Sequence, residues 1–333
     1  MRGTACTNVG SPLSWGKDDR EAQLKHLVLT AVALAAGACA TAPALPVGPP
    51  PPSPPTVSVF TVAHEDDWQL FMNPEAYHAM NEPQEKAVFI HVTAGDAGAG
   101  IGGEPVPYYL AREEGALRAV RFMANAADPS RGQGVGMVAA RVDRAGHTVQ
   151  RYTYANAVVY FLRIPDGNIV NGTVFTPHPQ SLTRLRAGEV SATETIDKSA
   201  TYVGWPDLVT TLNAIVEVET VAGSGLKLHI AELNEELNQR DHPDHRAVAF
   251  AMEDVALKHP CAPVVRHVEY FTKTMPMNVT GTDYMIDVGT WAATASGLSD
   301  NYAKGTWEPE HNAWLGRAYS RTQAPAAGCG ATS

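Results

Sequence analysis

Short apolar runs alternate along the chain with longer stretches in which apolar residues recur at helical spacing. Residues 57–62 and 86–93 are continuous, largely β-branched runs, and residues 227–230 form a shorter one. Runs of this length predict buried strands. Residues 108–126 and 206–218 place apolar side chains three or four positions apart, which predicts helices. Strands that alternate with helices predict an α/β fold: a three-layer, Rossmann-like, mostly parallel sheet with helices on both faces.

Two parts of the chain depart from this alternation. Residues 137–163 are β-branched and alternating, with turn signals at 144–146 and 165–168. This pattern predicts a hairpin or strands at the edge of the sheet. Beyond residue 280 the chain mixes Trp, Tyr and Gly with polar residues and predicts no definite secondary structure.

A polar cluster directly follows the first predicted strand. His64, Asp66 and Asp67 stand in the sequence A-H-E-D-D at 63–67, and residues 68–72 then predict the first turns of a helix. Open α/β sheets bind ligands at the carboxyl ends of their strands, and imidazole and carboxylate are ordinary zinc ligands. The same cluster also suits a capped helix without further function, because the helix dipole favours carboxylates at its N-terminus.

A second cluster, D-H-P-D-H at 241–245, opens a helix that is predicted to run to about His259. His242 and His245 are three positions apart, which places both on one face at the start of a helix. Such a pair alone is weak, since it arises often by chance. Together the two clusters supply histidine and carboxylate from separate segments, as in three-ligand catalytic metal sites.

The two clusters together resemble the signature of the PIG-L (LmbE-like) family of zinc-dependent de-N-acetylases. That signature is A-H-x-D-D after the first strand and H-x-D-H before a later helix, here at 63–67 and 242–245. The stretches 91–96 and 111–116 are also similar to the family. The resemblance covers roughly residues 56 to 270 and implies a Rossmann-like fold that binds one Zn²⁺ per chain.

The resemblance also implies roles for the residues of both clusters. His64, Asp67 and His245 would bind zinc and leave a fourth position for water, whose pKa the metal lowers toward about 7. Asp66 would be the general base, and His242 would face the tetrahedral oxyanion. Asp244 would orient a histidine from behind the ligands.

Substrate contacts implied by the resemblance fall on Arg112, Asp96 and Arg240. Arg240 stands two residues before H-x-D-H, where some members carry a Tyr. Glu65 replaces the family's common Pro, and Trp68 stands where an acidic residue is usual. A further histidine late in the chain is frequent in the family; His267 and His311 are the candidates here, and we expect both at the surface.

Net charge and cysteine content limit the classes of binding partner and of metal site that we expect. The chain has 333 residues and a net charge of −10, without a run of Lys or Arg, so nucleic-acid binding is not expected. Its four cysteines include no C-x-x-C pair, which argues against a cysteine zinc site. Cys261 and Cys329 could pair in an oxidising compartment, but we favour an unpaired reading, because sequence alone cannot bring the two within bonding distance.

The N-terminal region predicts export. Residues 27–36 are apolar but fall short of the ~20 residues of a membrane span and suit a signal-peptide core. A-G-A-C at 36–39 resembles a lipoprotein box, so Cys39 would be lipidated at a bacterial envelope; ordinary cleavage and secretion is the alternative. We therefore predict a leader at 1–39, a proline-rich spacer at 40–55 and the enzyme domain at 56–333.

The expected function is hydrolysis of an N-acyl bond, N-acetyl foremost, on an amino sugar or sugar conjugate in a periplasmic or outer-surface location. The alternative is a non-catalytic zinc- or carbohydrate-binding envelope protein with a vestigial site. An intact Asp66 favours the enzyme, because a vestigial site needs no base beside its ligands.

Overall fold

An eight-stranded sheet organises the part of the chain that the structure describes. This computed structural model describes residues 55–130, 136–171, 174–301 and 309–329. The strand order is β12-β11-β10-β1-β2-β5-β4-β3. In chain order the strands are β1 (Thr56–Val62), β2 (Glu85–Thr93), β3 (Val138–Arg144), β4 (His147–Tyr154), β5 (Ala157–Ile164), β10 (Gly225–Ala231), β11 (Val264–His267) and β12 (Ser320–Gln323).

The sheet is parallel in its middle and antiparallel at its edges. β11, β10, β1, β2 and β5 run parallel to one another, whereas β12 pairs antiparallel with β11 on one side, and β4 and β3 continue antiparallel from β5 on the other. Two small ribbons stand apart, β6 (Asn168–Asn171) with β7 (Val174–Pro177) and β8 (Ala192–Glu194) with β9 (Thr201–Val203). The predicted strands at 57–62, 86–93 and 227–230 are confirmed, and so is the mostly parallel sheet.

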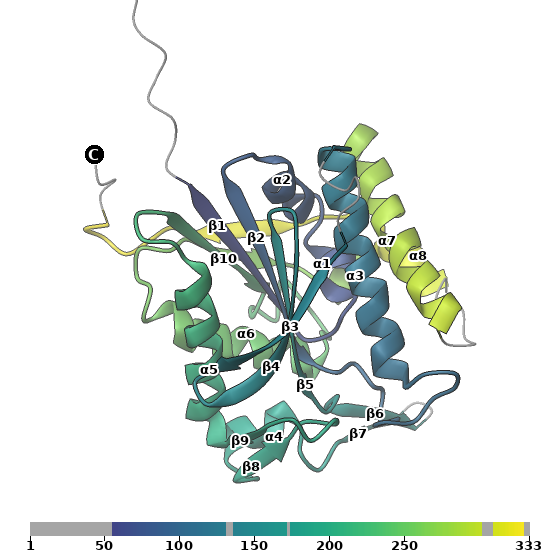
Figure 1. Cartoon of the computed structure of the whole chain (residues 1–333), viewed down its shortest axis with the longest axis vertical. Helices are drawn as coiled ribbons and strands as arrows, with labels where there is room; N and C mark the ends of the chain where they lie inside the picture. The colour runs from purple at the N-terminus through teal and green to yellow at the C-terminus, as the bar shows by residue number, and fades with distance from the viewer. Residues whose placement is uncertain (1–54, 131–135, 172–173, 302–308, 330–333) are drawn as a thin grey trace, which may run out of the picture. The chain divides into compact units, whose positions relative to one another are not determined.

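Helices cover both faces of this sheet (Figure 1). Successive residues of a strand point to opposite faces, so Val59 enters one core and Phe60 the other. The helices on the Val59 face are α4 (Leu182–Ala187), α5 (Gly204–Glu219) and α6 (Pro243–Ala256); those on the Phe60 face are α1 (Asp67–Phe71), α2 (Glu75–Asn81) and α3 (Tyr108–Ala127). The helices predicted at 108–126 and 206–218 are therefore confirmed, and α6 ends three residues before His259.

The segment predicted as an edge region has a mixed outcome. β3 and β4 do form an antiparallel hairpin at the edge of the sheet. β5, however, is buried at every position and lies inside the sheet, parallel to β2. Alternation is lost in a strand that is covered on both faces, so β5 reads as an uninterrupted apolar run.

The tail beyond residue 280 is structured, although its sequence predicts no element. α7 (Gly281–Asn301) packs along α3, α8 (Pro309–Trp314) follows, and β12 completes the sheet. The α3–α7 contact uses glycines: a Cβ on Gly297 would lie 2.5 Å from the Cα of Gly115. A helix contact built on small residues leaves no stripe of large apolar side chains, and this is why the pattern fails to show it.

A disulfide joins Cys261 to Cys329, with 5.2 Å between the two Cα atoms. The expectation that these cysteines stay unpaired is wrong. β12 runs antiparallel to β11 and so returns the tail to the strand that follows Cys261. That long-range pairing, which local sequence does not encode, brings the two thiols together.

The predicted leader, the lipidation site Cys39 and all of the spacer before Pro55 lie outside the described residues. Residues Pro52–Ser333 belong to one compact unit. Within the described ranges, the helices are all too short or too polar to cross a membrane.

Asp287 makes stability dependent on pH. It is buried on α7, where its Oδ2 accepts from the Gly316 N–H at 2.7 Å, and burial raises its pKa to about 7. The unfolded pKa is about 3.9, so the folded state holds the extra proton between these values, and stability falls as pH rises from about 4 to 7. The effect is up to about 4 kcal/mol, at 1.36 kcal/mol per pKa unit.

Replacing Asp287 by Asn should therefore remove much of the difference in Tm between pH 5 and pH 8, because the amide keeps an acceptor for Gly316 but cannot ionise. Calorimetry at both values measures this. The half-exposed Asp283→Asn on the same helix is the control and should keep the wild-type difference. An identical pH dependence for Asp287→Asn and the wild type would contradict the assignment.

The disulfide predicts a second stability effect. Cys261→Ser opens a link across 68 residues and should lower the free energy of unfolding by roughly 2–5 kcal/mol, since the unfolded chain regains entropy. Denaturant unfolding with and without reductant measures this. The double variant with Cys329→Ser should match the single variant and ignore reductant; a wild type that ignores reductant would contradict the bond.

Candidate metal centre

The loop after β1 turns His64 and Asp67 toward each other. Thr93 in β2 fastens the start of this loop, because its N–H and its hydroxyl both donate to the Ala63 carbonyl, at 2.9 and 2.8 Å. Asp67 begins α1, and its Oδ2 accepts from the His64 N–H at 2.7 Å. The turn into the helix thus folds the Asp67 carboxylate back over His64, two residues past the end of β1.

The start of α6 brings the second cluster to the same place. His242 is the N-cap residue and Pro243 the first helical residue, a position where a missing N–H is tolerated. His245 follows within the first turn and is almost completely buried. The rings of His242 and His245 have their centroids 5.2 Å apart, as the predicted shared face requires.

The three predicted ligands face a common point. His245 Nε2 lies 3.1 Å from both His64 Nδ1 and Asp67 Oδ1, and Asp67 Oδ2 lies 3.4 Å from His64 Nδ1. An ion with tetrahedral bonds of about 2.0–2.1 Å separates its ligand atoms by roughly 3.3 Å. Spacing and donor chemistry both fit a divalent cation. His64 and His245 also form, together with His242, a group that could hold a metal ion.

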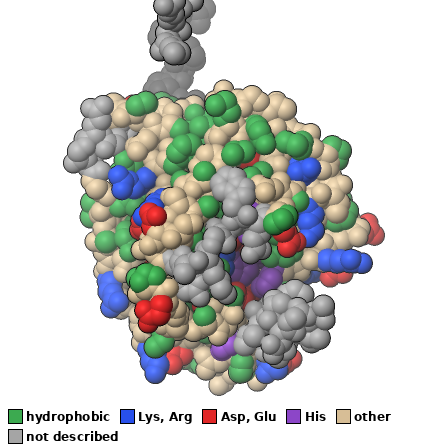
Figure 2. Space-filling model, turned by 90° about the vertical axis from the view of Figure 1, so that its right-hand side faces the viewer, with side chains coloured by type: hydrophobic (Ala, Val, Ile, Leu, Met, Phe, Trp, Pro, Cys, Tyr) green, Lys and Arg blue, Asp and Glu red, His purple; other side chains and the backbone are tan. Residues whose placement is uncertain are grey.

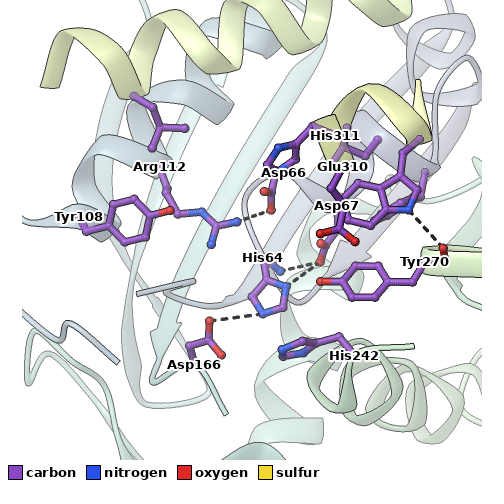
Figure 3. Close-up of a pocket in the computed structure, with 14 residues that line it drawn as sticks. His64, Asp66, Asp67, Tyr108, Arg112, Asp166, His242, Tyr270, Glu310 and His311 are labelled. Atoms are coloured by element: carbon purple, nitrogen blue, oxygen red, sulfur yellow. Dashed lines mark hydrogen bonds and ion pairs between the residues drawn. The ribbon is translucent and has the colours of Figure 1, made fainter. Parts of the chain in front are cut away.

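A carboxylate pair stands behind each of the two rings. Asp166 and Asp244 face His64 Nε2 at 3.7 and 3.8 Å, as Figure 3 shows for Asp166. Asp241 and Glu269 face His245 Nδ1 at 2.8 and 2.6 Å. Carboxylates draw the ring protons to these nitrogens. The lone pairs of both rings are thereby left on the nitrogens that face each other and Asp67.

The predicted roles of Asp244 and Asp96 fare differently. Asp244 does lie behind a histidine, and its Oδ2 accepts from the Gly167 N–H at 2.6 Å. Asp96 does not line the cavity: its two oxygens accept from the N–H groups of Asp166 and Gly100 at 2.8 and 2.7 Å. The structure thus makes Asp96 a support for the loop that carries Asp166, and not the substrate contact that the resemblance implied.

Charge around the rings is predominantly negative. Burial lowers the pKa of His64, but Asp67 and Asp166 outweigh it and raise that pKa to about 9. Burial is likewise outweighed at His245, whose pKa is raised by Asp67, Glu269 and Asp241. At Asp244, burial and then Asp166 raise the pKa to about 7. The excess of carboxylates favours positive charge at this point, which a divalent cation supplies.

Asp66 and Asp67 are neighbours with different partners. Asp67 faces the histidines, whereas Asp66 faces the cavity and forms an ion pair with Arg112 (Figure 3). Arg112 also pairs with the buried Glu65 at 3.2 Å and donates to the Gly95 carbonyl at 2.7 Å. A Cβ on Gly95 would lie 2.3 Å from Glu65 Oε2, so only glycine leaves room for this pair.

His242 is held as a neutral ring. Its Nδ1 accepts from the N–H of Asp244 at 3.2 Å, which leaves its ring proton on Nε2. Burial lowers its pKa, and the neighbouring His64 and His245 lower it further. The ring stands nearly perpendicular to His64, with centroids 4.6 Å apart, and it lines the cavity.

A cavity of about 290 Å³ opens beside these groups. Figure 2 shows histidine side chains in a hollow on the side of the molecule that faces the viewer. Its walls combine residues of both clusters with aromatic, charged and apolar side chains from later segments. The lining residues are His64, Asp66, Asp67, Leu70, Phe71, Tyr108, Arg112, Asp166, His242, Tyr270, Leu298, Glu310, His311 and Trp314. The predicted Arg112 is among them, whereas Arg240 is exposed and is not.

The late histidines are not the surface residues that we expected. His267 is completely buried in β11. His311 is partly buried and lines the cavity, stacked on Trp291 with 4.6 Å between centroids. Both belong to segments whose positions depend on strand pairing and on the folding of the tail.

Several residues of the site escaped the sequence analysis. Asp166 follows β5 and Glu269 follows β11, so both stand just past the carboxyl ends of parallel strands, where a ligand site is expected. Their position just after a strand was the sequence signal that could have identified Asp166 and Glu269 as site residues. Tyr270 gave none: its ring packs edge-on against His245 at 5.0 Å and stacks on Trp314 at 5.0 Å, contacts made across distant segments.

Glu269→Gln tests the carboxylates behind the ligands. Loss of this charge next to His245 Nδ1 should weaken Zn²⁺ binding by about 10–100-fold, because such partners fix the ring and raise its basicity. Competition with a chromophoric chelator measures the change. The exposed Glu235→Gln should bind Zn²⁺ as the wild type does, and an unaltered affinity for Glu269→Gln would refute the role.

Comparisons with known proteins add little to this geometry. No protein-family model and no curated protein matches the chain. Among solved structures, the fold is similar to GalB, the 4-carboxy-2-hydroxymuconate hydratase from Pseudomonas putida KT2440, at a TM-score of 0.35 and 11% identity over 78% of this chain and 82% of that chain. A likeness this remote carries no information on the activity of this chain.

Proposed function

We propose that this cavity is the active site of a metal-dependent hydrolase that removes an N-acyl group, N-acetyl foremost, from an amino sugar or sugar conjugate. One observation carries the proposal: three buried donor atoms converge, each histidine among them has carboxylates behind it, and Asp66 stands next to them but outside the donor set. Ligands together with a separate acid–base group are what hydrolysis requires.

His64, Asp67 and His245 are the residues that would hold the cation. A divalent cation there supplies positive charge that polarises an amide carbonyl and lowers the pKa of water. Two nitrogens and one oxygen suit Zn²⁺ and also Fe²⁺ or Co²⁺, so the donor set leaves the natural metal open.

Asp66 is the proposed general base and acid. In amide hydrolysis, water adds to the carbonyl carbon, the C–N bond breaks, and a carboxylate and an amine result. Asp66 would accept the proton of the water and return it to the leaving nitrogen. Its ion pair with Arg112 holds the carboxylate at the cavity wall, where a proton can be exchanged with substrate.

His242 is the proposed partner of the oxyanion. Because Nδ1 accepts from the backbone, Nε2–H is the donor that the ring offers. A fixed donor aimed at developing negative charge stabilises the tetrahedral state without reorganisation. The pKa of His242 is lowered, so the ring acts here as a neutral donor and not as a cation.

Size and lining support a sugar-sized substrate. At about 290 Å³, the cavity lies near the lower end of the roughly 300–1,000 Å³ of small-molecule pockets. It would enclose one ring and leave a longer conjugate outside. Tyr108 and Trp314 offer aromatic surface, and Glu310 and His311 offer hydrogen bonds to hydroxyl groups.

The proposal includes the PIG-L resemblance and an exported location. Both motifs of that family fall on the converging residues. The Cys261–Cys329 bond suits an oxidising compartment outside the cytoplasm. Attachment to a membrane through Cys39 belongs to the same proposal.

Asp66 and Asp67 should separate catalysis from metal binding. Asp66→Asn should keep a full complement of Zn²⁺ but lose about 10²–10⁴ in kcat, because only proton transfer is removed. Asp67→Ala should lose the metal of this site, one equivalent, together with activity. Metal content by mass spectrometry and acetate release from a panel of N-acetyl amino sugars measure the two quantities.

The controls make the outcome decisive. Excess Zn²⁺ should not rescue Asp66→Asn, and Asp283→Asn, remote from the cavity, should act as the wild type does. Loss of an equivalent of Zn²⁺ in Asp66→Asn, with the wild-type number of equivalents in Asp67→Ala, would reverse the two roles. A wild type that binds Zn²⁺ and the sugars without releasing acetate would favour the alternative, a non-catalytic binding protein of the envelope.

A further inference from the structure

A second cluster of metal-ligating residues lies on the Phe60 face of the sheet. Glu75 begins α2, His229 lies in β10 and His267 ends β11. His229 stacks on Phe60 at 4.1 Å, which places it on the face that α2 covers. His229 Nδ1 lies 3.0 Å from His267 Nε2, and Glu75 Oε2 lies 3.2 Å from His267 Nδ1. One ligand atom of each residue lies within 4.8 Å of the others.

We propose that Glu75, His229 and His267 form a second divalent-cation site, which takes Zn²⁺ and links the three segments that carry these residues. Two imidazoles and one carboxylate are a donor set that zinc uses with three protein ligands. The residues come from three separate segments, so a bound ion would cross-link them. None of the three lines the cavity of the first site.

Burial makes an ordinary polar cluster a poor explanation. His229 is 4% exposed and His267 is completely buried, yet His229 Nε2 has no hydrogen-bond partner among the residues that the structure describes. A buried polar atom without a partner costs about 1–3 kcal/mol. The ring therefore has a nitrogen available for an ion beyond the one that faces His267.

The surroundings of Glu75 provide what a site of this kind needs. Ser320 in β12 donates its hydroxyl to Glu75 Oε1 at 2.8 Å and so orients the carboxylate from behind. The other oxygen, Oε2, faces His267. The Glu75 side chain is 35% exposed, which gives an ion a route from solvent into a site whose other two ligands are buried.

A cation at this point would fasten elements that flank the catalytic cavity. α2 follows α1, which begins at Asp67, and β11 leads within two residues to Glu269 behind His245. An ion that links Glu75 to His229 and His267 would hold α2 against β10 and β11. The second ion therefore supports the first site mechanically and takes no part in the reaction.

Counting bound zinc in the full-length protein tests this site. The chelator-treated wild type, dialysed against Zn²⁺, should bind two equivalents, and Asp67→Ala should retain one. Glu75→Gln keeps an acceptor for Ser320 but loses the charged ligand. Its loss of affinity at one site should exceed the roughly 10–100-fold that follows removal of a partner behind a ligand.

His78→Gln on the same helix is the matched control, because its exposed ring pairs with Asp283 and should leave both equivalents in place. The combined Glu75→Gln and Asp67→Ala variant should bind no zinc, with its fold checked by circular dichroism. A metal-free Asp67→Ala, or a Glu75→Gln that binds as the wild type does, would overturn the second site. Neither result depends on hydrolase activity, so the proposed function stands or fails separately.

Discussion

Two histidine nitrogens that lie 3.1 Å apart, His64 Nδ1 and His245 Nε2, with carboxylates behind both rings, set the conditions for the rest of the site. Lone pairs at that distance repel unless a proton or a cation lies between them. The carboxylates of Asp166, Asp244, Asp241 and Glu269 bias the ring protons to the far nitrogens. Positive charge is thereby favoured at the centre, and the buried Asp67 carboxylate adds further negative charge beside it.

Such a concentration of buried charge is stable only if the backbone holds it in place. At Gly167 the backbone comes close to Asp244, and the Gly167 N–H donates to the Asp244 carboxylate. A Cβ at this position would lie only 2.2 Å from Asp244 Oδ1. Gly95 does the same for the Glu65–Arg112 pair. Asp96 fixes the backbone of Asp166. Groups without any part in the chemistry are thus what gives the ligands their orientation, as second-layer contacts do in metal sites.

The tail gives the cavity its outer wall. α7 approaches α3 closely through Gly115 and Gly297, and α8 then places Glu310, His311 and Trp314 over the ligands. β12 brings Cys329 to Cys261 and Ser320 to Glu75. One C-terminal segment therefore closes the pocket, fastens the sheet edge and completes the surroundings of the second histidine cluster.

Local sequence patterns predict the central strands, several of the helices and the two clusters that carry chemistry. Local periodicity is enough for a buried strand such as 57–62 or a helix such as 108–126, because each is decided by side chains within a few residues. The two motifs, through their resemblance to the PIG-L signature, brought His64, Asp67 and His245 into one hypothesis. The groups that surround these residues are set by the tertiary structure. Asp166, Glu269 and Tyr270 reach the site through strand order, Asp96 turns inward to the backbone, and Arg240 stays at the surface. Those outcomes, like the pairing of Cys261 with Cys329, depend on contacts between segments far apart in the chain, which no local pattern encodes.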